Sequence, residues 1–247
     1  MRWTQGIGQG LMIALAFCAP AAAQEKVIRF GLTGDYPPFA ERLSDGSYAG
    51  ADVVIARRIA QGMGARAEFV LTGWTRLSED FAAGRFDVAI GGLTVLPDRA
   101  ALGTFSIPLM DDGKRPLALC RDKGRYRSIA AIDRPGVRVQ INRGPAIAAL
   151  AKQWFRQASV TVNPDDATLT DRLLNGQADV WITDGVVVDH MARLHRGKLC
   201  ATTREPFTHL TKAWLIRNDP ALIAGINAGL ARALKDGSWQ KALRAVR

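Results

Sequence analysis

The chain has 247 residues, of which 48% are hydrophobic and 23% charged, and its formal net charge is +10. This length is enough for one large domain or two small ones, each with a proper core. The positive charge is consistent with an anionic partner or an anionic membrane face, and equally with a basic solvated surface. No run of Lys and Arg with interleaved aromatic residues is present, which argues against a nucleic-acid-binding protein.

The first residues have the composition of a secretory signal peptide. Arg2 precedes an apolar run from Leu11 to Phe17, and small residues follow up to Ala23, where we expect cleavage. The run is too short to span a bilayer, and no later stretch is long and apolar enough to do so. Phe17 stands where a lipid anchor on Cys18 would need a small residue. We therefore predict a soluble mature chain that is exported to the periplasm.

Cys120 and Cys200 are the two cysteines that follow the signal peptide. In an oxidising, exported setting we expect them to form a disulfide, and two buried free thiols are the alternative. The histidines at 190, 195 and 209 lack the spacing of zinc ligands. No metal and no cofactor is predicted.

Short β-rich segments alternate with helical segments in which apolar residues recur periodically. The first half contains "VIRFGL", a helix over 51–63, "AEFVL", a helix over 77–83 and "DVAI". The cycle then restarts with "GVRVQI", a helix over 145–157, "SVTV", a helix over 167–175 and "DVWI". A strand "KAWLI", a helix over 220–234 and a terminal helix from Ser238 follow. Such alternation predicts an α/β fold with largely parallel sheets, and the restart predicts two similar lobes.

One pattern occurs twice, in "AGRFDVAIGGLTVLPDR" from Ala83 and in "NGQADVWITDG" from Asn175. In each copy a helix ends at a glycine, Gly84 or Gly176, where a left-handed residue costs least. A short buried strand follows, and the chain turns at its carboxyl end, where open α/β sheets place ligands. Backbone N–H groups in such turns can bind anionic groups. Two edges of this kind facing each other predict a ligand cleft.

The ordered motifs "GDYPPF", "GSYAGADVVIARRIA", "GRFDVAIGGLTVLPDRAALGTFSIPL" and "GQADVWITD" resemble the periplasmic solute-binding proteins of amino-acid ABC transporters. The resemblance extends from about Val27 to the C-terminus. It implies the type II periplasmic binding protein fold, in which two α/β lobes with mainly parallel sheets are joined by two hinge strands. Lobe one would comprise residues 24–113 and 206–247, and lobe two residues 114–205. It also implies a monomer that closes on a small anionic or zwitterionic ligand and meets a membrane permease.

The resemblance assigns ligand contacts to the cleft. Arg99 matches the arginine that holds a ligand carboxylate with two parallel hydrogen bonds. Thr94 and the turn at Gly92 would add donors, and Asp184 matches the acid that holds an α-amino group. The structural alternatives are that Arg99 caps a helix or pairs with an aspartate at 80 or 98, and that Asp184 only caps the helix over 185–194.

Tyr36 and Trp74 match the aromatic walls around the ligand's side chain, where flat rings give a large contact area. The alternative for both residues is an ordinary place in the core. We expect closure to be a hinge motion around residues 112–115 and 205–212.

The stretches "TGDYPPF", "FSIPLMDDGKRPLALC", "IDRPGVRVQIN", "VNPDDATL" and "RLH..KLC" also resemble a branch of this family, the cyclohexadienyl dehydratases, which remove water and carbon dioxide from prephenate or arogenate. Both cysteines match that branch, which supports the disulfide. Lys114 matches a lysine of the dehydratase cleft.

This sequence departs from the branch where chemistry would occur. Val187 stands at the position of the dehydratase glutamate, a group suited to protonate a leaving hydroxyl in a closed site. From Asn142 the chain has "NRGPAI" in place of Asn-Pro-Gly-Gly-Thr-Asn, and Pro145 supplies no N–H. Asp189 lies about 200° around the predicted helix from Val187 and should point away.

These departures favour a binding protein with no catalytic residue. Asn142 is kept as a ligand-site residue, and Arg143 is either a contact for a second anionic group or a solvated surface residue. Two other hypotheses remain: an active dehydratase that uses an unassigned acid, and an exported accessory protein that binds another protein.

Overall fold

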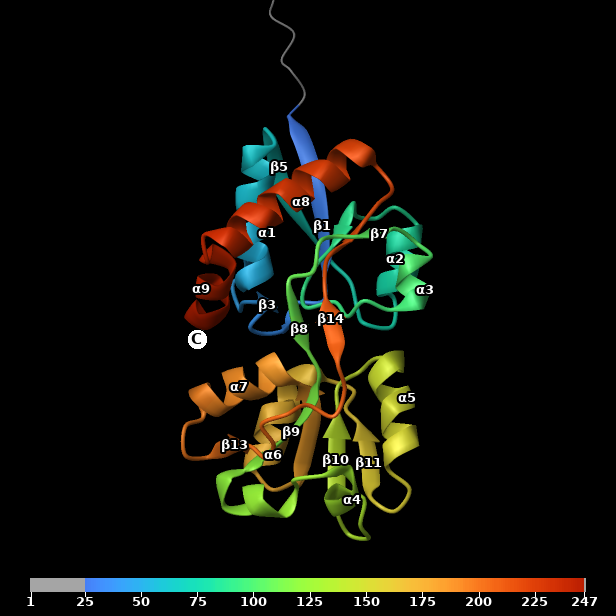
Figure 1. Cartoon of the computed structure of the whole chain (residues 1–247), viewed down its shortest axis with the longest axis vertical. Helices are drawn as coiled ribbons and strands as arrows, with labels where there is room; N and C mark the ends of the chain where they lie inside the picture. The colour runs from blue at the N-terminus through green and yellow to red at the C-terminus, as the bar shows by residue number, and fades with distance from the viewer. Residues whose placement is uncertain (1–24, 247) are drawn as a thin grey trace, which may run out of the picture.

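The structure, a computed structural model, describes residues 25–246. The predicted signal peptide, with its cleavage site at Ala23, lies outside the described residues. The described chain forms two α/β lobes stacked along the long axis of the molecule and joined by two strands (Figure 1). No helix within residues 25–246 has the length and apolar character needed to cross a membrane.

The first lobe is built on a five-stranded sheet in the order β5-β1-β6-β15-β7. Its strands are β1 (Lys26–Leu32), β5 (Ala65–Leu71), β6 (Val88–Ala89), β7 (Thr104–Phe105) and β15 (Leu215–Ile216). Its helices are α1 (Ala51–Gly62), α2 (Leu77–Ala82), α3 (Pro97–Ala100), α8 (Pro220–Lys235) and α9 (Ser238–Ala245). A small sheet of β2 (Asp35–Tyr36), β3 (Ala40–Arg42) and β4 (Tyr48–Ala49) lies on the side that faces the second lobe.

The second lobe repeats this plan in the order β11-β10-β12-β9-β13. Its strands are β9 (Lys114–Leu119), β10 (Arg138–Ile141), β11 (Ser159–Val162), β12 (Val180–Asp184) and β13 (Leu199–Ala201). Its helices are α4 (Ile129–Ile132), α5 (Pro145–Trp154), α6 (Leu169–Leu174) and α7 (Gly185–Leu194), with 3-10 turns η1 (Cys120–Arg125) and η2 (Asp166–Thr168). Both sheets are mixed, because β15 in lobe one and β9 in lobe two run antiparallel to both of their neighbours, while the other neighbouring strands pair in parallel.

The repeated sequence pattern corresponds to equivalent strands. β6 in lobe one and β12 in lobe two each occupy the third position of their sheet, next to the parallel strands β1 and β10. Gly84 and Gly176, which precede them, have φ values of 70° and 68°, as expected for left-handed residues that end a helix. The carboxyl ends of β6 and β12 therefore lead into the space between the lobes.

Local sequence explains where several helices begin and end. Asp219 accepts hydrogen bonds from the N–H groups of Ala221 and Leu222, and α8 begins directly after it at Pro220. The helix predicted over 145–157 ends earlier, at Trp154, because Phe155 is already extended. The helix predicted over 167–175 is split into η2 and α6.

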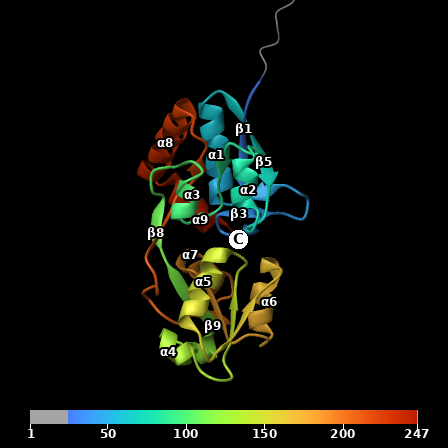
Figure 2. The same ribbon diagram turned by 90° about the vertical axis from the view of Figure 1, so that its right-hand side faces the viewer.

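Two antiparallel strands, β8 (Met110–Asp112) and β14 (Leu210–Lys212), connect the lobes. They run along one edge of the molecule in the side view (Figure 2). Directly after β8, a Cβ atom on Gly113 would lie 1.7 Å from the carbonyl oxygen of Thr208, so only glycine fits where the two connections pass.

The predicted disulfide is present. Cys120 and Cys200 are bonded with an S–S distance of 2.05 Å and join residues 80 positions apart in the sequence. The bond ties the start of η1 to β13 at the far edge of the lobe-two sheet, which confirms the pairing expected for an exported protein.

Candidate functional site

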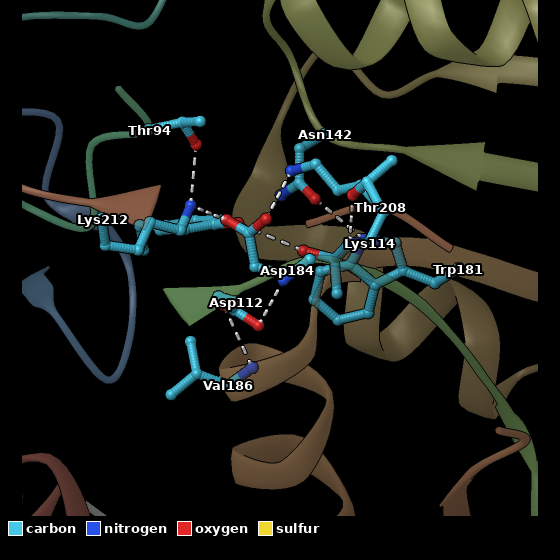
Figure 3. A network of polar contacts seen from close by, with 12 residues as sticks. Thr94, Asp112, Lys114, Asn142, Trp181, Asp184, Val186, Thr208 and Lys212 are labelled. Carbon is cyan, nitrogen blue, oxygen red and sulfur yellow. Dashed lines mark hydrogen bonds and ion pairs between the residues drawn. The ribbon is translucent and has the colours of Figure 1, made fainter. Parts of the chain in front are cut away.

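Asp184, at the carboxyl end of β12, is the centre of a polar network between the lobes (Figure 3). Its side chain is buried, and both of its carboxylate oxygens bind cations of the protein. Lys114 Nζ donates to Oδ1 at 2.6 Å, and Lys212 Nζ donates to Oδ2 at 2.5 Å. The hydroxyl of Tyr36, from lobe one, donates to Oδ2 at 2.7 Å. Asp184 also occupies the N-cap position of α7, but its side chain caps no N–H group there.

The two ammonium groups determine the charge state of this network. Burial by itself would raise the pKa of Asp184, but Lys114 and Lys212 hold it well below the usual range of an aspartate. Burial lowers the pKa of Lys212, and the Asp184 carboxylate acts in the opposite direction. Burial next to Asp184 raises the pKa of Tyr36 well above its usual value, so this phenol stays protonated. At neutral pH, Asp184 is therefore an anion.

Arg99, in the short helix α3, lies on the lobe-one side and is 8% exposed. Its Nη1 donates to the carbonyl oxygen of Thr94 at 3.0 Å. Burial lowers its pKa, and Asp98 and Asp184 act in the opposite direction. No carboxylate of residues 25–246 lies within ion-pair distance of Arg99; Asp80, a partner considered from the sequence, pairs with two other arginines. The guanidinium is thus buried without a carboxylate partner in the described chain.

A buried aspartate, Asp52, accepts hydrogen bonds from the glycine turn that follows β6. Asp52 Oδ2 accepts hydrogen bonds from the N–H groups of Gly91 and Gly92 at 2.9 and 3.1 Å, and its Oδ1 accepts one from Trp239. The N–H of Gly92 is therefore already used, in contrast to the expectation that it would serve a ligand. Thr94 Oγ1 accepts a hydrogen bond from Lys212 at 2.9 Å.

Two tryptophans fix the polar side chains beside the network. Trp181 Nε1 donates to Asn142 Oδ1 at 3.0 Å. Trp74 Nε1 donates to Asp35 at 3.0 Å, and its ring meets that of Tyr36 edge-on with the centroids 5.2 Å apart. Tyr36 and Trp74 therefore pack against each other as one aromatic surface.

All eight residues predicted to contact a ligand line a single cavity between the lobes, with a volume of about 60 Å³. They are Tyr36, Trp74, Gly92, Thr94, Arg99, Lys114, Asn142 and Asp184. Arg143, which the sequence left unassigned, and Lys212 also line it. We call this space the first cavity. It is the size of a few water molecules and fits a small head group.

Sequence reasoning missed Lys212 and Asp52. Lys212 is 1% exposed and Asp52 is 0% exposed, although lysine and aspartate are almost never fully buried unless they are paired. Their partners lie 28 and about 40 positions away along the chain, so the sequence around each residue does not indicate the pairing. The only hint is that each stands at the edge of an apolar segment.

Val187, at the position of the dehydratase glutamate, is 1% exposed and packs in the core. Asp189, two residues further on, has an exposed side chain that pairs with Arg115 at 2.8 Å. It lines no part of the first cavity, which confirms the orientation expected from the helical spacing. No group of three or more His, Cys, Asp or Glu side chains within residues 25–246 is arranged to hold a metal ion.

Comparison with known proteins agrees with this architecture. The family model of the bacterial extracellular solute-binding proteins, family 3, matches residues 28–245. Cyclohexadienyl dehydratase of Pseudomonas aeruginosa is 36% identical over 235 residues, which cover 91% of this chain and 87% of that protein. The L-cystine-binding protein of Escherichia coli K12 is 26% identical over 211 residues, which cover 85% of this chain and 78% of that protein.

Solved structures give the same result. An ancestral amino-acid-binding protein, described as a precursor of cyclohexadienyl dehydratase, superposes with a TM-score of 0.78 at 28% identity, covering 89% of this chain and 95% of the other. A putative ABC transporter binding component from Wolinella succinogenes, complexed with lysine, superposes with a TM-score of 0.79 at 28% identity, covering 89% and 94%. The chain therefore belongs to the bacterial extracellular solute-binding proteins, family 3.

Proposed function

We propose that this chain is a periplasmic solute-binding protein that closes on a small carboxylate and delivers it to the permease of an ABC transporter. The observation that carries the proposal is the buried guanidinium of Arg99, which has no carboxylate partner in the described chain. A buried charge without a partner is costly. A ligand carboxylate would supply that partner, because its two oxygens match the planar fork of arginine.

The charge of the first cavity supports an anionic ligand. Four cationic side chains line it, and Asp184 is the only carboxylate among its lining residues. Two of the cations, Lys114 and Lys212, bind Asp184, while Arg143 pairs with Asp35 at 3.1 Å. Of these four cations, Arg99 is the one without a carboxylate partner within the described residues, and the ligand carboxylate would pair with it.

The bonds of Asp184 to two lysines disfavour ligands with an ammonium group on the α-carbon. An α-ammonium group placed at Asp184 would have to compete with the ammonium groups of the protein, because both oxygens already bind lysines. We therefore propose that Asp184 orients Lys114 and Lys212 and that the preferred carboxylate carries no ammonium group on its α-carbon. The role first expected for Asp184, as the partner of an α-amino group, remains the competing prediction.

Calorimetric titration with matched acids tests this function. The ligands are phenylpyruvate, phenylalanine and 3-phenylpropanoate, together with pyruvate, alanine and propionate, and Arg99→Ala is the control that places binding in the cavity. Within each set we expect an acid without an amino group to bind at least about tenfold more tightly than the amino acid. Tighter binding of phenylalanine or alanine would show that Asp184 releases a lysine and takes the ammonium group.

Dehydratase activity is the second candidate, favoured by the 36% identity to cyclohexadienyl dehydratase. Val187 supplies no acid, but Asp166 is a buried carboxyl whose pKa burial raises to about 6, as proton donors in closed sites require. Incubation with prephenate, followed by detection of phenylpyruvate, separates the two functions. Turnover that disappears in Asp166→Asn would establish the enzyme, and binding of prephenate without turnover would support the binding protein.

A further inference from the structure

A second cavity, of about 320 Å³, lies between the lobes next to the first one and shares Tyr36 and Asn142 with it. Its lobe-one wall comes from β2, β3 and the residues beside them, and its lobe-two wall from η2, α6, β12 and α7. β3 and α7 face each other across this space in Figure 1. Because the first cavity has only about 60 Å³, the second has room for the remainder of a ligand whose head group fills the first.

The two cavities carry opposite charge. The second is lined by four carboxylates, from Asp35, Glu41, Asp166 and Asp171, and by one cationic side chain, Arg42. Arg143 pairs with two of these acids, with Asp35 at 3.1 Å and with Oδ1 of Asp166 at 4.0 Å. A group that enters this space therefore meets an excess of negative charge, which favours a cation.

A buried acid in this wall has an unsatisfied oxygen. Asp166 is 6% exposed; its Oδ1 accepts the N–H of Arg143 at 3.0 Å, and its Oδ2 has no hydrogen-bond partner within residues 25–246. Buried polar groups are nearly always hydrogen-bonded, so an orphaned carboxylate oxygen beside a cavity indicates a missing partner. An ammonium group, with three N–H donors, is such a partner.

Two histidines, His190 and His195, line the second cavity, and the first of them is neutral. His190 is 2% exposed, and burial lowers its pKa to about 4, with Arg193 acting in the same direction. Its Nδ1 lies 2.9 Å from Nη2 of Arg193, which can only donate, so the ring proton is on Nε2. This N–H group has no partner in the described chain and is free to serve an oxygen acceptor. A neutral His190 does not repel a cation.

We infer that the second cavity binds a cationic group at the far end of the ligand, so that the ligand is a carboxylate whose ammonium group is remote from it. This inference rests on the proposed function, because the first cavity must hold the carboxylate. Both oxygens of Asp184 already bind ammonium groups of the protein, whereas Oδ2 of Asp166 has no hydrogen-bond partner within the described residues. The ligand class is that of ω-ammonium carboxylates.

Titration calorimetry at pH 7.5 with the purified exported protein tests the inference. The ligands are ω-aminocarboxylates of three to six carbons, each paired with the plain carboxylate of the same length, and 2-aminobutyrate is the α-amino comparison. We expect at least one ω-aminocarboxylate to bind at least about tenfold more tightly than its plain partner, and 2-aminobutyrate to bind no better than butyrate.

Substitutions of the acidic residues test whether the gain in affinity from the ω-amino group arises in the second cavity. Asp166→Asn keeps the shape of the side chain and should reduce the affinity ratio of each ligand pair to within about twofold. A ratio measured on one variant is insensitive to a general change in affinity. Asp171→Asn, at an exposed position of the same wall, should reduce the affinity ratio as well. It replaces Asp166→Asn in the test if that variant does not fold. Asp179→Asn is the matched control, because Asp179 pairs with Arg138 and lines neither cavity.

The outcomes separate this inference from the proposed function. If plain carboxylates bind in an Arg99-dependent manner but no ω-amino group improves their affinity, the second cavity is not a cation site and the proposed function stands. If the ratio persists in both acid variants, the ammonium group binds elsewhere and the inference is wrong. If no carboxylate of either kind binds, both the proposed function and this inference are wrong.

Discussion

Lys212 and Asp184 form a buried ion pair, 2.5 Å between Nζ and Oδ2, that links a strand connecting the lobes to the carboxyl end of the central strand of lobe two. Tyr36 from lobe one donates to the same oxygen. The arrangement of the two lobes is thus held by polar contacts of the protein itself, at the centre of the candidate ligand site.

Asp184→Asn should destabilise the protein strongly. The substitution leaves two buried ammonium groups without their carboxylate, and removal of one member of a buried ion pair costs about 3 to 5 kcal/mol. We expect a loss of this size in the free energy of unfolding at pH 7, measured by urea denaturation. Asp189→Asn, which removes an exposed partner of Arg115, should cost less than about 1 kcal/mol. Equal effects of the two substitutions would contradict the central role of Asp184.

Arg99→Ala should weaken binding of carboxylate ligands by about 3 kcal/mol or more, because the ligand would be buried without its cation. Arg99→Lys should restore only part of the affinity, since an ammonium group cannot form the two parallel hydrogen bonds of a guanidinium. Calorimetry measures both effects. An unchanged dissociation constant for Arg99→Ala would remove this residue from the ligand site.

Asp166→Asn should stabilise the unliganded protein in a pH-dependent manner. The folded-state pKa of Asp166, about 6, exceeds its ordinary value of 3.8, so ionised Asp166 costs stability above pH 6 and this cost disappears below about pH 4. The variant should therefore exceed the wild type by about 1 to 3 kcal/mol at pH 8, with a difference that shrinks towards pH 4.

Urea denaturation of both proteins at several pH values measures this difference. A difference independent of pH would show that Asp166 has an ordinary pKa. The prediction also bears on function, because a carboxylate that destabilises the free protein is typical of a residue kept for a ligand.

Loss of the disulfide should destabilise lobe two. Cys120→Ser combined with Cys200→Ser releases a loop closed across 80 positions, for which we expect a loss of about 2 to 4 kcal/mol. The fall in the thermal midpoint of the double variant should match the effect of reductant on the wild type. Reductant that lowers the midpoint of the double variant as well would contradict this explanation.

The sequence predicted most of the fold because helices and strands depend on local patterns. The periodicity of 51–63 gave α1, and the repeated glycine and Asp-Val pattern placed β6 and β12 at equivalent positions of two lobes. Local patterns did not predict β8 and β14, whose three residues each are too short for a periodic signal, and the expectation of two hinge strands came from the family resemblance. Local patterns also gave no indication that the sheets are mixed, because the direction in which a returning strand joins a sheet is not a local property.

For the site, the sequence by itself predicted eight of the residues that line the first cavity, because the ordered motifs that contain them resemble those of a known family. Only the tertiary structure decided what those residues are paired with. Asp184 binds two lysines 70 and 28 positions away, one of them the unexpected Lys212. The acidic second cavity brings Asp35 and Glu41 of lobe one to Asp166 of lobe two. Burial and charge partners depend on contacts between distant segments, and no local pattern encodes them.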